Sequence, residues 1–352
     1  MIRKSIFYYS ASTQFSNAGD ALINRELLSL LRLFGEMRIA RAGAPDAFLE
    51  EIGARPGEVR HEKRSALMLE MIKRAIQGKA SEQSYLVLTP GDPPGNISVG
   101  DLVRALLFPF LRLMGVRIVK IGASVSRMQS SRLRLEAFLS KFMYYYGLRD
   151  QGSIERARSF SFRNTEYCPD LAFNLVPVQV GESASALGIS LRNDNLTEEE
   201  WHELRARCKS LVTSLATGTG DDPKVAFVAQ VERDAAGMRD LQREWSFPGS
   251  DFIQSHSLRD LQDRYRELGI VISNRLHVIL LAAASGSTPI CLPTGTKNSK
   301  ITQLLHSVGL AKLVVVSPSE MGDIAELRAA IQPAFEAQRR LLHSCLSSKL
   351  QS

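Results

Sequence analysis

The chain has 352 residues, 44% of them hydrophobic and 23% charged, which is an ordinary composition for a globular protein. The length favours two domains, because single hydrophobic cores stop growing at about 250–300 residues. The formal net charge of +7 suits an anionic substrate or an anionic membrane surface. No basic tract with interleaved aromatic residues is present, so we expect no nucleic-acid partner, and no apolar run reaches the ~18 residues of a membrane span.

The four cysteines, Cys168, Cys208, Cys291 and Cys345, are far apart and form no C-x-x-C pair. This spacing indicates neither a zinc site nor a disulfide framework, so we expect no metal. Scattered reduced cysteines, with an N-terminus too polar after Ser10 for a secretory signal, predict a cytoplasmic location.

The N-terminal residues predict a strand at Lys4–Ser10 and an amphipathic helix at Ala21–Phe34, with the turn Asn17–Asp20 between them. Gly19 in this turn lets the backbone approach a ligand closely. Asp20 suits the helix dipole and is placed to bind a sugar hydroxyl, although a capping role alone fits its position equally well. This strand, turn and helix open a Rossmann-like half.

Later strands of the same half end in polar residues. The pattern predicts a core helix at Val99–Met114 and a strand at Arg117–Gly122, which Ser124 follows. Arg149 and Asp150 follow a short extended piece. Because ligands bind at the carboxyl ends of parallel strands, Ser124, Arg149 and Asp150 are candidate binding residues.

The second half restarts after a polar connector at Val176–Ser185, with a strand at Ala186–Arg192 that ends in the candidate residue Arg192. Helices and strands then alternate; a helix capped by Ser257 is one expected element, and Lys312–Val316 is an expected late strand. Strands alternating with helices in two sets predict an α/β fold with two Rossmann-like domains, whose parallel sheets face across a cleft.

The stretch Gly269–Lys300 organises this second half. A buried strand ends at Ser273, Asn274 is expected to be the N-cap of the next helix, and Arg275 and His277 begin that helix. Helix N-termini attract anions, a guanidinium suits carboxylate or phosphate, and imidazole exchanges protons near neutral pH.

Lys297 lies beyond the next strand's end, within reach of the same edge. Each of these residues also has a plain interpretation. Arg275 can pair with a local carboxylate, His277 can be a core histidine, and Lys297 can be a solvated loop lysine.

We therefore divide the chain into three parts: residues 1–178 as the N-terminal domain, 186–322 as the C-terminal domain, and 323–352 as a C-terminal helix that packs back across a domain. The final helix places Arg339 and Lys349 beside Leu342 and Leu346, so peripheral contact with an anionic membrane is the alternative for it. No P-loop, G-x-S-x-G elbow, H-E-x-x-H or G-x-G-x-x-G motif is present. The residues alone thus indicate a two-domain α/β enzyme with an anionic ligand.

Several short motifs occur in a familiar order: N-x-G-D at Asn17–Asp20, an Arg149-Asp150 pair with Ser153, S-x-R at Ser190–Arg192, and S-N-R-L-H at Ser273–His277 with a downstream Lys297. In this order they resemble the polysaccharide pyruvyl transferase family. The resemblance runs from about Asn17 to Leu310, and the R-L-H block is its most specific piece.

The resemblance implies a GT-B-like fold and a reaction that moves pyruvate from phosphoenolpyruvate onto two hydroxyls of one sugar, with release of phosphate. The acceptor would be a glycan or lipid-linked oligosaccharide precursor of a bacterial cell-surface polymer, reached in the cytoplasm or peripherally at the inner membrane face, with no cofactor besides the donor. The chain departs from the family in the loop at 91–95 and after Gly122, so acceptor identity transfers least.

On this hypothesis, the catalytic residues are His277, Arg275 and Asp20. The substrate-binding residues are Asn17, Gly19, Ser124, Arg149, Asp150, Arg192, Ser273, Asn274 and Lys297. The C-terminal domain would hold phosphoenolpyruvate and the N-terminal domain the acceptor. Two alternatives stay open: a GT-B glycosyltransferase that uses a nucleotide sugar, and a non-catalytic glycan-assembly protein.

Overall fold

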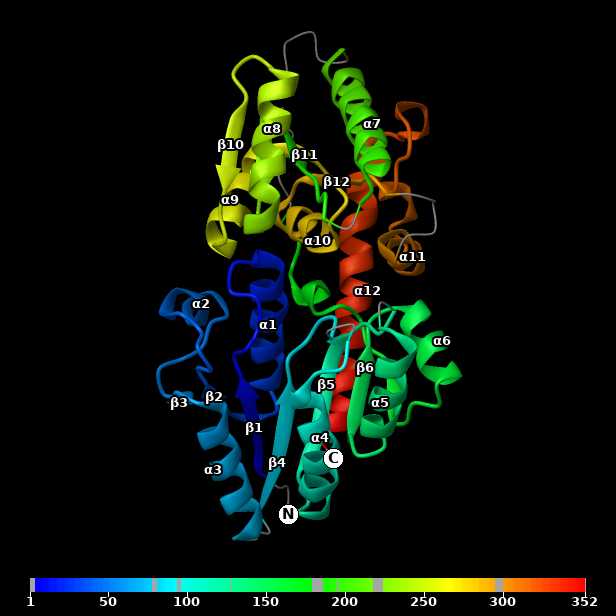
Figure 1. The fold of residues 1–352 in the computed structure, drawn as a ribbon. Helices are drawn as coiled ribbons and strands as arrows, with labels where there is room; N and C mark the ends of the chain where they lie inside the picture. The colour runs from blue at the N-terminus through cyan, green and yellow to red at the C-terminus, as the bar shows by residue number, and fades with distance from the viewer. Residues whose placement is uncertain are drawn as a thin grey trace. The chain divides into compact units, whose positions relative to one another are not determined.

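The structure is a computed structural model that describes residues 4–77, 81–93, 96–126, 128–178, 186–194, 196–217, 224–294 and 300–351 (Figure 1). Contacts divide the chain into two compact units. Unit 1 comprises Met1–Phe15, Asp20–Leu171 and Arg339–Ser352, and unit 2 comprises Ser16–Gly19 and Ala172–Gln338. The main passage between the units, at Leu171–Ala172, comes before the polar connector that suggested a boundary in the sequence.

Unit 1 is built on a seven-stranded parallel sheet with the strand order β3-β2-β1-β4-β5-β6-β7. Its strands are β1 (Lys4–Ser10), β2 (Gly35–Ala40), β3 (Val59–His61), β4 (Glu82–Leu88), β5 (Arg117–Ala123), β6 (Tyr145–Leu148) and β7 (Thr165–Tyr167). Its helices are α1 (Ala18–Leu31), α2 (Asp46–Glu51), α3 (Arg64–Ile76), α4 (Val99–Leu113), α5 (Ser130–Ser140) and α6 (Gln151–Ser159). The short 3-10 helix η1 (Leu171–Asn174) follows at the boundary.

Unit 2 is built on a five-stranded parallel sheet with the strand order β10-β9-β8-β11-β12. Its strands are β8 (Ala186–Ser190), β9 (Val225–Ala229), β10 (Asp251–Gln254), β11 (Leu268–Ser273) and β12 (Thr288–Cys291). Its helices are α7 (Glu198–Thr217), α8 (Ala235–Trp245), α9 (Leu258–Glu267), α10 (Leu276–Ser285) and α11 (Lys300–Ser307), with the 3-10 helices η2 (Glu232–Asp234), η3 (Ala311–Leu313) and η4 (Pro318–Glu320). Two parallel sheets with alternating helices confirm the predicted α/β fold.

Local chemistry explains why these elements begin and end where they do. Ser257 precedes α9 and its hydroxyl accepts from the backbone N–H of Asp260, which confirms the predicted cap. Helix α10 is buried from Val278 to Ser285 and ends at Gly286, whose φ of 100° only a residue without a side chain adopts at low cost. An almost wholly apolar helix thus lies inside unit 2, and only its first turn is partly exposed.

Three sequence expectations were wrong at the level of elements. The expected strand at 312–316 is instead η3 followed by a single bridge between Cys291 and Val314. Asn274 does not cap α10, because Arg275 occupies the N-cap position. The expected core helix α4 buries only Asp101, Phe108 and Leu111, and its other face is exposed.

The last helix, α12 (Ile324–Leu350), contributes residues to both units: up to Gln338 it belongs to unit 2, and from Arg339 it belongs to unit 1. Its apolar residues Leu342 and Leu346 are fully buried. Lys349 forms an ion pair of 2.5 Å with Glu166. The apolar side chains considered for membrane contact therefore face the protein interior.

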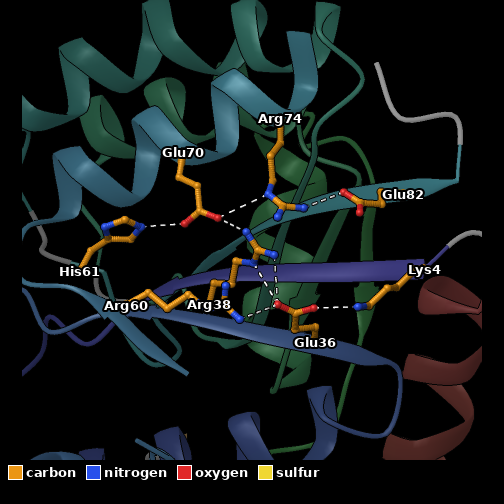
Figure 2. A network of polar contacts seen from close by, with 8 residues as sticks. All are labelled: Lys4, Glu36, Arg38, Arg60, His61, Glu70, Arg74 and Glu82. Carbon is orange, nitrogen blue, oxygen red and sulfur yellow. Dashed lines mark hydrogen bonds and ion pairs between the residues drawn. The ribbon is translucent and has the colours of Figure 1, made fainter. Parts of the chain in front are cut away.

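A network of ion pairs connects α3 with the sheet of unit 1 (Figure 2). Glu70 on α3 contacts Arg38 on β2 and His61 on β3, the latter at 2.6 Å. Arg74 contacts Glu70 at 3.4 Å and Glu82 on β4 at 2.9 Å. Because Glu70 and Arg74 point toward the strands, α3 presents a different set of side chains to solvent.

Candidate functional site

The strand order of unit 2 reverses between β8 and β11, which is the position where ligands bind in open α/β sheets. Arg192 follows β8, and β11 ends with Ser273, which Asn274 and Arg275 follow. The side chain of Asn274 connects the segments that follow β8 and β11. Its Oδ1 accepts from the Arg192 N–H at 2.7 Å, and its Nδ2 donates to the Arg192 carbonyl at 2.9 Å. Asn274 therefore continues the pairing of the two strands beyond their ends.

The side chain of Ser273 also holds this loop in place. Its hydroxyl donates to the Ser190 carbonyl at 2.6 Å and accepts from the backbone N–H of Arg275 at 3.0 Å. Both Ser273 and Asn274 are buried. We infer that these two predicted binding residues hold the loop in place, so that the side chains after them are oriented.

Arginines and aspartates alternate at this edge. Arg275 donates to Asp234 at 2.5 Å and lies 3.7 Å from Asp194. Arg192 donates through two nitrogens to Asp194, and Arg233 lies 3.2 Å from Asp194. Three guanidinium groups thus share two carboxylates, and one net positive charge remains for an anionic ligand.

Burial and ion pairing shift the pKa values of this cluster. Burial raises the pKa of Asp234 above its usual range, against the opposing hydrogen bond and charge of Arg275. Burial also acts to raise the pKa of Asp194, but the hydrogen bonds and charges of the arginines outweigh it and lower that pKa. Burial lowers the pKa of Arg275, which still stays protonated because guanidinium starts so high.

The segment Asn17–Gly19, in which α1 begins, belongs to unit 2 and packs against His277 in the first turn of α10. Asn17 forms an antiparallel bridge with Val231, and the Gly19 N–H donates to Asn17 Oδ1 at 3.0 Å. A Cβ added at Gly19 would lie 2.7 Å from His277 Nδ1. Only glycine fits here without moving the imidazole, so the structure brings together two predicted site residues that are 258 positions apart in the sequence (277 − 19).

In unit 1, polar residues converge at the carboxyl ends of β4 to β7. Arg149, after β6, donates to Asp170 at 2.8 Å and to Asp92 at 2.9 Å. Burial opposes the charge on Arg149, but Asp170 and Asp92 outweigh it and raise the pKa of the guanidinium. This arginine is held between two carboxylates, one that follows β4 and one that follows β7.

Asp150 and Ser124 lie in a second, buried cluster at the same edge. Asp150 is the N-cap of α6 and accepts from the Ser153 N–H at 2.7 Å and from its hydroxyl at 2.9 Å. The Ser153 hydroxyl also lies 3.0 Å from Ser124 Oγ. The carboxylate of Asp150 is thus used within the protein, and a substrate contact through it stays a prediction.

Two further predicted residues complete the set. Asp20 belongs to unit 1 by its contacts and accepts from Thr13 Oγ1 at 3.0 Å. Lys297 lies outside the described residues, so its predicted role stays a prediction.

Sequence reasoning placed Asp92 and Asp170 at strand carboxyl ends without giving them a role, and it missed Asp194 and Asp234 altogether. Asp194 and Asp234 pair with the predicted arginines, and Asp92 and Asp170 hold Arg149. Their signal was their position, because each follows a strand and carboxyl ends of parallel strands meet at one edge. Among residues that the structure describes, no three His, Cys, Asp or Glu side chains come together as a metal site.

The comparisons with known proteins decide the family. Residues 17–295, well over half of the 352-residue chain, match the polysaccharide pyruvyl transferase family. This chain belongs to the polysaccharide pyruvyl transferase family. The matched region begins at Asn17 and includes His277 and both edges described above.

Solved structures share the fold of this pyruvyl transferase family member at low sequence identity. The putative UDP-N-acetylglucosamine 2-epimerase from Listeria monocytogenes has a TM-score of 0.55 at 7% identity, covering 97% of this chain and 91% of that chain. The UDP-GlcNAc 2-epimerase from Methanocaldococcus jannaschii has a TM-score of 0.52 at 10% identity, covering 97% and 99%. A UDP-glucosyltransferase from Polygonum tinctorium has a TM-score of 0.51 at 10% identity, covering 99% of both chains. These likenesses confirm a GT-B-like fold.

No curated protein matches the sequence. Within the described part of this family member, every helix is too short or too polar to cross a bilayer.

Proposed function

We propose that this protein transfers pyruvate from phosphoenolpyruvate onto two hydroxyls of one sugar in a bacterial cell-surface glycan precursor. The contact between Gly19, at the start of α1, and His277 carries the proposal. It sets a titratable ring at the N-terminal turn of α10, beside the arginine cluster, within the region that matches the family. An anion-attracting helix end with an adjacent acid–base group suits a donor that must be both bound and protonated.

The donor side of the proposal is the edge of unit 2. Phosphoenolpyruvate carries a carboxylate and a phosphate, which would be held by Arg275 and Arg192, by the N-terminal end of α10 and by Lys297. The acidic partners Asp194 and Asp234 fix the guanidinium groups in place before the donor arrives. The donor is itself a substrate, and the proposal needs no cofactor.

The chemistry conserves protons. His277 gives a proton to the methylene carbon, which becomes a methyl group, and the central carbon becomes electrophilic. One sugar hydroxyl adds to that carbon, the bond to the phosphate oxygen breaks, and the second hydroxyl closes the ring. Of the two hydroxyl protons, one replaces the proton that His277 gave and the other leaves on phosphate.

The acceptor side of the proposal is the polar edge of unit 1. Arg149 and Ser124 would bind sugar hydroxyls there, with Asp20 and Asn17 to orient or deprotonate the attacking one. The scattered reduced cysteines support a reaction in the cytoplasm.

The first experiment measures phosphate release from phosphoenolpyruvate with a panel of glycosides and a lipid-linked glycan fraction. We expect acceptor-dependent release that falls by at least about 100-fold in His277→Ala, because general acid–base catalysis contributes about 10²–10⁴-fold. The matched control is His306→Ala on the exposed side of α11, which should keep full activity.

Two results would contradict the proposal. One is release that His277→Ala leaves unchanged. The other is an absence of release with any acceptor while a nucleotide sugar raises the thermal unfolding midpoint of the protein, which would assign the chain to the glycosyltransferases. Arg275→Ala is the weaker test, because it also leaves the buried Asp234 without its partner.

A further inference from the structure

One face of unit 1 is unusually apolar for a protein surface. On α4, six large side chains are exposed: Val99, Leu102, Val103, Leu106, Phe110 and Leu113. With 3.6 residues per turn, all six fall within an arc of about 100° on the helix. Leu106 is 81% exposed and Leu113 is 88% exposed, so this stripe is in full contact with solvent. Contiguous exposed apolar surface of this kind marks an interaction site.

The neighbouring helices extend the stripe. Residues of α3, α4 and α5 join one hydrophobic cluster with the same side of the sheet, and α4 contacts α5 directly. The outer side of α3 exposes Leu69 and Ile76, and the outer side of α5 exposes Phe138. We call these nine exposed apolar residues, together with the exposed basic residues described next, the α3–α5 face.

The charges on the α3–α5 face have one sign. Lys73 lies on the same stripe of α3 as Leu69 and Ile76, while Arg134 and Lys141 flank Phe138 at α5. All three basic residues are exposed, and none forms an ion pair with another residue that the structure describes.

Acidic residues of the same helices are turned inward. Glu70 points to the sheet, where it pairs with Arg38 (Figure 2). Asp101 is buried against Arg132, and so is Glu136 at 2.6 Å. These are the carboxylates of the described α3, α4 and α5, so their exposed face combines apolar side chains with positive charge alone.

We propose that the α3–α5 face binds the surface of an anionic lipid bilayer, with the apolar stripe of α4 lying in the interface. Charge complementarity selects this occupant, because a second copy of the same positive face would be repelled. The 15 residues of α4 span about 22 Å, and they suit a helix that lies along a bilayer rather than across it. This inference is independent of pyruvyl transfer, because membrane binding needs no substrate.

The test is sedimentation of the full chain with vesicles of phosphatidylcholine alone or of equal parts phosphatidylcholine and phosphatidylglycerol. We expect the protein to bind the anionic vesicles more tightly. Leu106→Asp with Leu113→Asp should reduce this binding by at least about tenfold, because apolar contact and charge together give interfacial affinity. Both positions are exposed, so the thermal unfolding midpoint should stay unchanged.

The matched control is Leu33→Asp with Val176→Asp, which adds the same charge at residues that are 64% and 67% exposed but lie outside the α3–α5 face. It should bind vesicles like the wild type. In Arg134→Gln with Lys141→Gln, the ratio of affinity for anionic vesicles to affinity for neutral vesicles should fall by at least about tenfold.

Three outcomes would overturn the proposal. The first is a wild type that sediments with neither vesicle. The second is equal loss of binding in the α4 variant and its control. The third is a dimer in lipid-free solution that the α4 variant abolishes, since this would assign the face to a second copy of the chain.

Discussion

A single glycine controls the position of the proposed acid–base group. Gly19→Ala would place a methyl group 2.7 Å from His277 Nδ1, so the imidazole must move. We expect kcat for phosphate release to fall by about 100-fold, because displacement of a reacting group by about 1 Å costs this much. The measurement is steady-state kinetics beside the thermal unfolding midpoint.

Gly322→Ala is the control for this change, since an added Cβ there meets no atom within 4 Å. It should leave both kcat and the unfolding midpoint unchanged. Full activity in Gly19→Ala would show that the position of His277 is not critical.

Lys120 is a buried lysine whose charge destabilises unit 1 at neutral pH. Burial lowers its pKa to about 8, with smaller effects from Glu136 and the nearby arginines. The folded state therefore favours neutral Lys120, and protonation below the folded pKa costs roughly 3 kcal/mol at pH 7. This cost shrinks as pH rises from 8 toward the unfolded pKa, and it falls below about 1 kcal/mol at pH 10.

We expect Lys120→Met to be more stable than the wild type at pH 7. The gap between their free energies of unfolding should narrow at pH 10. Urea unfolding at both pH values measures this gap. The exposed Lys209→Met should show no comparable gap at either pH. A gap for Lys120→Met that is independent of pH would contradict the burial argument.

At the scale of elements, α4 is held to unit 1 by the carboxylate of Asp101. It accepts from the Ser98 N–H and hydroxyl at 2.9 and 2.6 Å and pairs with the fully buried Arg132. Asp101→Ala removes the N3 side chain of the capping box that Ser98 begins, and it leaves Arg132 with Glu136 alone. We expect a loss of about 3 kcal/mol in the free energy of unfolding, measured in urea.

The control for Asp101 is Asp46→Ala on α2, where the ion pair with Arg41 is exposed. Asp46→Ala should lower the free energy of unfolding by less than about 1 kcal/mol. Adding Arg132→Leu to Asp101→Ala should lower the stability further, because it leaves the buried Glu136 without its charged partner. Equal losses of unfolding free energy in Asp101→Ala and Asp46→Ala would contradict the argument that burial makes the Asp101–Arg132 pair more important for stability.

Sequence patterns located most elements but could not assign their faces. Helix α4 is apolar on two sides, so its periodicity gave no way to tell the side that packs on Phe108 and Leu111 from the exposed one. The edge of unit 2 shows a similar limit. Arg275 was identified from its place after a strand, but its partner Asp234 is 41 residues away and meets it only through the strand order.

Asn274 illustrates a related difficulty. Its residue type favours a helix cap, yet its amide instead joins the backbone of Arg192 across the ends of two strands. Such pairing depends on which strands are neighbours, and strand order is set by the whole sheet. Single-sequence reasoning therefore found the residues of the edge better than it found their partners.

At the scale of the whole molecule, both units take buried residues from one helix, α12. Leu342 and Leu346 are buried within unit 1, whereas Leu327 and Ile331 are buried within unit 2. Leu342→Ala with Leu346→Ala should destabilise unit 1 by about 2–5 kcal/mol per residue and leave unit 2 nearly unchanged.

The two tryptophans, at positions 201 and 245, both belong to unit 2, so tryptophan fluorescence reports on that unit. We expect the Leu342/Leu346 variant to unfold in two steps, with circular dichroism changing before fluorescence. Leu327→Ala with Ile331→Ala should move the fluorescence midpoint instead. Equal fluorescence shifts in both variants would show that the units unfold together.

The division of α12 also affects the order of events during synthesis. A ribosome makes Gln338 before Arg339, so all of unit 2 is translated before unit 1 is complete. Unit 1 still lacks Leu342 and Leu346, which are buried in its core. The unit that starts first is thus the one completed last. Nascent unit 1 would leave the exit tunnel with an unfilled apolar site, which is a natural target for chaperones until the final turns of α12 emerge.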